Sequence, residues 1–78
     1  MMRTEEYLRR GKLAELRDLL EGCKKKIERL LGEIRVGAFP LQGVERVDAA
    51  ALQQATEELG QEQERLAEIK RQIAELEV

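Results

Sequence analysis

Apolar residues recur along most of this chain at alternating steps of three and four positions, and this spacing restricts the fold more than any other feature. It is the heptad pattern of a helix whose apolar seam faces another helix. Two segments carry the pattern, and the chain's only Phe and only Pro lie between them. The seam residues of the first segment are Leu13, Leu16, Leu20, Cys23, Ile27, Leu30 and Ile34. Those of the second segment are Leu52, Ala55, Leu59, Glu62, Leu66, Ile69, Ile73 and Leu76.

The two seams predict helices over about residues 4–35 and 48–77, joined by a loop at residues 36–47. Two helices of similar length with such a connection favour an antiparallel pair. The sequence therefore predicts an all-α fold, an antiparallel two-helix coiled-coil hairpin that forms one domain over residues 1–78, with residues 1–3 frayed. A chain of 78 residues has difficulty burying a sufficient core by itself.

Local signals place the ends of the loop. Asp48 is a good N-cap for the second helix. Gly37 is positioned to end the first helix in the left-handed conformation that favours glycine. Pro40 prevents Phe39 from continuing that helix, and a β-turn is expected to begin at Phe39 or at Pro40.

The charges of the two helices indicate how they pair. Residues 1–35 carry ten Lys/Arg against seven Asp/Glu, and residues 48–78 carry three against eight. These opposite net charges favour the first helix beside the second, within one chain or between chains. Leu19 and Leu31 flank the first seam and widen its apolar stripe beyond what one neighbour covers. We therefore expect a homodimer that forms a four-helix bundle, with a different protein as the alternative source of the missing half of the core.

The sequence offers little for catalysis. It contains no histidine, which removes the commonest general base and the commonest metal ligand. Cys23 lies on the seam, so we expect a buried side chain there and not a reactive thiol. We expect no enzymatic activity, no cofactor and no metal.

Glu62 is the one charged residue on the second seam. If Ile34 lies opposite Ala55, then Glu62 faces Ile27 in the same register. Two basic side chains are then within possible reach of it: Lys26 and Arg29. We interpret Glu62 either as a hydrated point in the seam or as a residue that sets the register.

Basic residues cluster at two places in the first helix: Arg9, Arg10 and Lys12, and then Lys24, Lys25 and Lys26. Acidic neighbours dilute both clusters, and no aromatic side chain is interleaved for stacking on bases. The net charge of −2 likewise gives no reason to expect nucleic acid or an anionic membrane as partner. A solvated helix face is the favoured interpretation, and a small nucleic-acid-associated regulator is the alternative.

The loop is unusually apolar for a connecting segment. Its apolar residues either fold over the open end of the seam, which we favour, or form an exposed anchor for a partner. The candidate partner-binding residues are Phe39, Pro40, Leu41 and Val44.

The chain resembles the small uncharacterised two-helix proteins of Mu-like bacterial prophages. The features that carry this resemblance are the basic first helix, the apolar proline-containing loop, the Ala-rich start of the second helix and its closing motif "ERLAEIKRQIAELE". The resemblance spans most of the chain and implies a phage-derived accessory protein. It brings no activity, cofactor or functional residue with it.

The expected function is that of a non-enzymatic, oligomeric coiled-coil interaction or scaffold protein. Its expected partners are a second copy of itself and, through the loop, another protein. The sequence has no apolar run of transmembrane length and no signal-peptide core near its start, so we expect a cytoplasmic protein.

Overall fold

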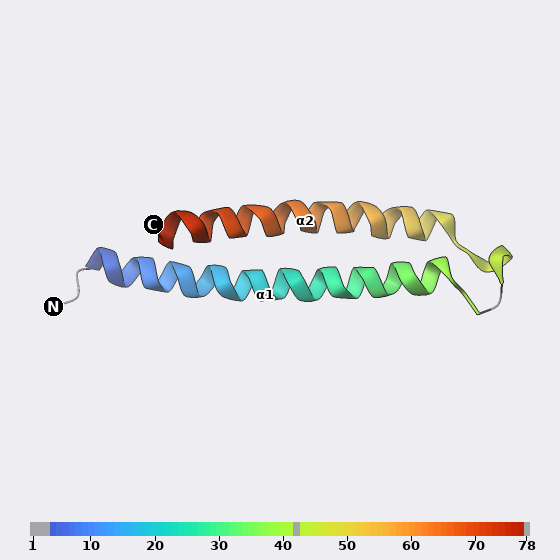
Figure 1. The fold of residues 1–78 in the computed structure, drawn as a ribbon, viewed down its shortest axis with the longest axis horizontal. Coiled ribbons are helices and arrows are strands. Elements are labelled where there is room, and N and C mark those ends of the chain that lie inside the picture. Colours follow the sequence, from blue (N-terminus) through green and yellow to red (C-terminus); the bar gives the residue numbers. More distant parts are fainter. Residues whose placement is uncertain (1–3, 42, 78) are drawn as a thin grey trace.

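The computed structural model describes residues 4–41 and 43–77, and it consists of two long helices side by side (Figure 1). Helix α1 covers Thr4–Ala38, the short 3₁₀ helix η1 covers Val44–Arg46, and helix α2 covers Ala49–Glu77. The chain forms a rod of 66 × 16 × 14 Å with the connecting loop at one end (Figure 1). The predicted all-α helical hairpin is confirmed. The expected fraying at residues 1–3 lies outside the described residues.

The start of α2 follows the capping rule. The Asp48 side chain accepts a hydrogen bond through Oδ1 from the backbone N–H of Ala51, at 3.1 Å. The Asp48 carbonyl accepts the first intrahelical bond from Leu52, also at 3.1 Å. Asp48 therefore satisfies one of the unpaired N–H groups of the first turn, and the predicted N-cap is confirmed.

The end of α1 differs from the prediction. The helix continues to Ala38, and its last turn is closed by a hydrogen bond from the Phe39 N–H to the Arg35 carbonyl, at 3.2 Å. Gly37 is an ordinary helical residue, so the left-handed cap expected there is wrong. A Cβ atom on Gly37 would lie 3.0 Å from Leu52 Cδ2. Glycine is used at this position because α2 passes close to the helix, not because the backbone needs a special conformation.

The backbone conformation that favours glycine occurs at Gly43, which has a φ of 104°. The Gly43 N–H donates to the Pro40 carbonyl at 3.3 Å, which closes a turn beginning at Pro40. Of the two β-turns considered from sequence, the one starting at Pro40 is therefore present. The 3₁₀ turn of η1 then leads the chain back to Asp48.

The seam is built as the heptad pattern predicts. Residues 37 and 52, which are in close contact, are each three positions from residues 34 and 55, so the predicted register holds at the loop end. If Leu13 is labelled a and Leu16 d, the fully buried residues of both helices are d residues. They are Leu16, Cys23 and Leu30 of α1, and Glu62 and Ile69 of α2.

Candidate interaction surface

The a residues of the two seams are covered less well than the d residues. All eight are only half-buried: Leu13, Leu20, Ile27 and Ile34 of α1, and Leu52, Leu59, Leu66 and Ile73 of α2. In an antiparallel helix pair the a rows of both helices lie on the same side of the contact, next to the e positions. One long side of the rod is therefore lined by two rows of partly covered Leu and Ile side chains. We call this side, with its eight a residues, the open face.

The flanks of the seam show this asymmetry in part. On α2, Glu58 and Gln72 in g positions are half-buried and Gln63 and Lys70 in e positions are exposed, but Arg65 in a g position is exposed as well. The ion pair of Arg17 with Glu77 joins two e positions and crosses the a side of the seam near the end of α2. Sequence periodicity located the seam correctly, but it does not report how the two helices are rotated about their own axes.

The loop residues do not cover the end of the seam. Phe39 is 80% exposed, Leu41 100% and Val44 86%, so the favoured interpretation of the loop as a plug is wrong for these three. The turn that starts at Pro40 directs the chain away from the helix ends, and the half-buried Pro40 lines a hollow with Phe39, Leu41 and Val36. All four candidate partner-binding residues belong to the segment between α1 and α2, and Figure 1 shows that this segment lies at one end of the rod.

Cys23, Lys26 and Glu62 form a polar cluster inside the seam. Lys26 Nζ lies 3.0 Å from Glu62 Oε1, and the Cys23 Sγ lies 3.3 Å from both Oε2 and the backbone carbonyl of Glu62. The predicted reach of Lys26 is confirmed, whereas Arg29 instead pairs with Glu33 along its own helix, at 3.7 Å. No buried side-chain oxygen or nitrogen of the described residues lacks a hydrogen-bond partner. Glu62 is therefore a satisfied buried acid and not a hydrated gap in the seam.

The electrostatics of this cluster keep both groups in their ordinary ionisation states. The hydrogen bond from Lys26, followed by that from Cys23, lowers the pKa of Glu62 although burial acts in the opposite direction. Burial and the neighbouring Glu62 carboxylate raise the pKa of the Cys23 thiol. Glu62 thus remains charged and Cys23 remains a protonated, unreactive thiol at neutral pH, as expected for a seam cysteine.

Several of the clustered basic side chains are already paired. Lys12 lies 3.9 Å from Glu15 and Lys24 lies 3.7 Å from Glu21, in addition to the pair of Lys26 with Glu62. These pairs leave less unbalanced positive charge on α1 than the sequence clusters suggest. They favour the interpretation of a solvated helix face.

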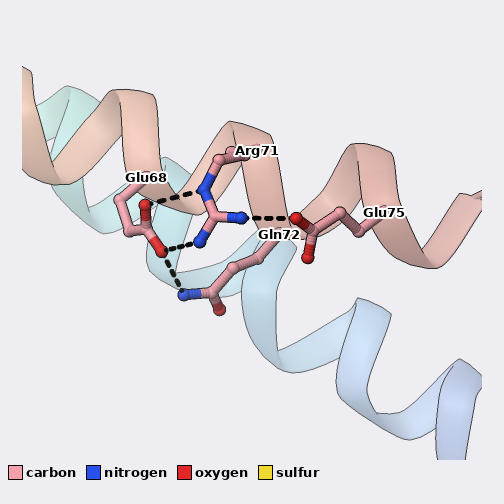
Figure 2. A network of polar contacts seen from close by, with 4 residues as sticks. All are labelled: Glu68, Arg71, Gln72 and Glu75. Atoms are coloured by element: carbon pink, nitrogen blue, oxygen red, sulfur yellow. Dashed lines mark hydrogen bonds and ion pairs between the residues drawn. The ribbon is translucent and has the colours of Figure 1, made fainter.

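The outer side of α2 satisfies its charges locally. Figure 2 shows Arg71 between Glu68 and Glu75, with Gln72 also donating to Glu68 at 3.0 Å. The Arg71 guanidinium, with help from Gln72, lowers the pKa of Glu68 to about 2. Because these residues are spaced three and four apart on one helix, the network stabilises α2 without engaging α1.

Two further apolar side chains stand at the other end of the rod. Tyr7 is 70% exposed and Leu8 is 64% exposed, near the start of α1. Figure 1 shows that the start of α1 extends beyond the end of α2. Neither residue falls on the 3–4 seam, so the heptad pattern did not select them. The one available signal in the sequence was that both residues precede Leu13. Leu13 is the first seam residue of α1, so no seam residue of α2 lies opposite Tyr7 or Leu8.

Comparisons with protein-family models, curated proteins and solved structures give no match. The functional argument therefore depends on the residues of this chain. In residues 4–41 and 43–77, no three His, Cys, Asp or Glu side chains are grouped so that they could hold a metal ion. Neither helix in this part of the chain has a stretch long and apolar enough to cross a bilayer.

Proposed function

We propose that this chain is a non-enzymatic interaction protein that associates with a second copy of itself through the open face, forming a four-helix bundle. The observation that carries the proposal is the pair of half-buried a rows on one side of the rod. Apolar rows of this length that an isolated chain covers only partly are typical of a helix interface.

The size of the buried core supports self-association. Among the described residues, only four apolar side chains are fully buried: Leu16, Cys23, Leu30 and Ile69. A core of this size is small for a chain of 78 residues. Packing a second hairpin on the open face would cover eight more Leu and Ile side chains in each copy.

In this proposal the bundle is a scaffold, and the loop is its second contact surface. Phe39, Leu41 and Val44 are exposed at one end of the rod, where an apolar side chain can enter a groove of another protein. A phage-derived accessory role in the cytoplasm agrees with the resemblance noted from sequence, and it remains part of the proposal.

Light scattering across a concentration series, with helicity followed by circular dichroism on the same samples, tests the proposal. We expect twice the 9.0 kDa chain mass and high helicity at every concentration. A fully helical monomer throughout the series would overturn the proposal, because the open face would then be stable in water.

Two leucines offer a matched pair of variants. Leu31 is 47% exposed beside the open face, and Leu19 is 45% exposed on the opposite flank of the same helix. We expect Leu31→Glu to shift the equilibrium to monomer and Leu19→Glu to leave the dimer mass unchanged. Both side chains are largely exposed in the single chain, so neither substitution should unfold the hairpin. Equal effects of the two substitutions would argue against the open face as the interface.

A nucleic-acid-associated regulator remains the alternative, through Arg9, Arg10, Lys12 and the three lysines from Lys24 to Lys26. The ion pairs of Lys24 and Lys26 reduce the support for it. A salt-dependent mobility shift of duplex DNA would favour this alternative, and absence of binding at low salt would exclude it.

A further inference from the structure

We propose that the two copies of the chain lie with both loops at the same end of the bundle, related by a two-fold axis parallel to the helices. This inference rests on the self-association proposed above and specifies its geometry. It is carried by the open face, the charges of the two helices and the heights of the seam layers.

Two-fold symmetry leaves two ways to place one open face against another. If the axis runs along the rod, α1 packs against α2 of the partner subunit and the two loops lie at one end. If the axis runs across the rod, α1 packs against α1 of the partner subunit and the loops lie at opposite ends. Neighbouring helices are antiparallel in both arrangements, so the helix dipoles do not distinguish them.

The charges of the helices distinguish the two arrangements. Thr4–Ala38 contains nine Lys/Arg and seven Asp/Glu, a net charge of +2, and Ala49–Glu77 contains three and seven, a net charge of −4. An axis along the rod gives every helix two neighbours of opposite charge. An axis across the rod places like-charged helices side by side.

Single exposed pairs contribute little, and of the acidic residues of α2 only Glu77 is in an e position beside the open face. The contrast comes from α1, whose e positions beside the open face carry Arg10, Arg17 and Lys24. An axis across the rod would place these cations against the same positions of the partner subunit, and this repulsion selects against that geometry.

The heights of the seam layers give an independent reason. An axis along the rod keeps every residue at its own height, so each seam layer meets the same layer of the partner without any adjustment of register. Glu62 occupies a d position that the single hairpin already buries, so it lies away from the open face and retains its own Lys26 at 3.0 Å in the dimer.

The arrangement also accounts for the exposed loop. Phe39, Leu41 and Val44 of one copy would lie beside the same residues of the other, and the two apolar ends would share the surface that each exposes alone. At the opposite end, Tyr7 and Leu8 of the two copies would likewise be neighbours.

Distances between nitroxide labels, measured by double electron–electron resonance, test the orientation. One label replaces Arg46 (Arg46→Cys) at the loop end, and a second protein carries it near the middle of α1 (Lys25→Cys), both in a Cys23→Ala background. Arg46 and Lys25 are exposed, so the labels leave the apolar surfaces intact. The unlabelled Cys23→Ala protein must first show the mass and helicity of the parent chain.

With both loops at one end, we expect the two labels at position 46 to lie roughly 15–30 Å apart, because neighbouring helices in a bundle are 8–10 Å apart. Loops at opposite ends would separate these labels by close to the 66 Å length of the rod and would overturn the inference. Labels at position 25 should be about 40 Å apart or less in either arrangement. A dipolar signal at position 25 with a long distance at position 46 would therefore reject the orientation and retain the dimer. Absence of a dipolar signal at both positions would reject the dimer itself.

Discussion

Lys26 Nζ lies 3.0 Å from Glu62 Oε1, so a lysine at the edge of α1 neutralises a carboxylate that is buried in the seam of α2. The thiol of Cys23 completes the hydrogen bonding of that carboxylate from the layer beside it. An acid at a d position is expensive to bury, and two side chains, those of Lys26 and Cys23, compensate for it. The cluster is therefore better explained by specificity than by stability.

Replacing Glu62 with leucine tests this explanation. We expect Glu62→Leu to raise the melting temperature, because an apolar side chain of similar size avoids the desolvation of the ion pair. The same substitution at the exposed Glu64 is the control and should have little effect. A lower melting temperature would show that the pair with Lys26 stabilises the fold.

Glu68 should contribute to the loss of stability of the folded chain at acidic pH. Its pKa is lowered to about 2 by Arg71, from an ordinary value of 4.5. Since the folded-state pKa is the lower one, the stabilisation is complete above about pH 4.5 and is lost as the pH falls towards 2. Titration of the side-chain carboxyl carbon by NMR should give a midpoint near 2. Because the group is exposed, added salt should raise that midpoint.

Arg71→Gln is the matched control for this titration. Removing the guanidinium should return the pKa of Glu68 towards its ordinary value, with α2 still folded. A midpoint that stays near 2 in this variant would contradict the role of Arg71 shown in Figure 2.

Three glycines should respond differently to alanine. A Cβ on Gly60 would contact nothing within 4 Å, so Gly60→Ala should stabilise α2 by about 0.5–1 kcal/mol. Gly37→Ala should gain less or nothing, because its Cβ would displace the Leu52 side chain. Gly43→Ala should be destabilising by about 1 kcal/mol or more, since φ is 104° there. Urea denaturation of the three variants measures all three effects.

One lysine of α2 should be replaceable by an acid that forms a new ion pair with α1. Arg17 forms an ion pair across the helices with Glu77, at 2.9 Å. One heptad towards the loop, the equivalent positions are Lys24 in α1 and Lys70 in α2. Lys70→Glu should therefore create a second pair of the same kind and raise the melting temperature by about 1–3 °C at low salt. The gain should disappear in high salt, and a gain that persists there would point to a different cause.

Sequence alone predicted the elements of the fold because they depend on short-range patterns. The alternation of three and four specified both seams, and an aspartate followed by alanines specified the start of α2. Gly37 was misjudged because glycine serves two purposes near a helix end. It permits a left-handed turn, and it also permits another chain segment to pass closely. Only the position of Leu52 distinguishes these two roles.

The candidate surface was less predictable for a related reason. The same seam residues fit a hairpin rotated towards its a rows or towards its d rows, and rotation decides which side remains open. Whether the side chains of Phe39 and Leu41 are buried or exposed depended on the direction of the turn that begins at Pro40. Neither property is encoded in the hydrophobic pattern of a single segment.

The rod holds Thr4 of α1 and Glu77 of α2 at the same end, away from the loop (Figure 1). This placement determines how the chain would respond to mechanical load. A force applied between these two residues would separate the helices one seam layer at a time, starting at the ends of the chain. It would not load all the layers in shear at once. Such a chain resists stretching weakly at its ends, and the last contact to part would be the one between Gly37 and Leu52 beside the loop.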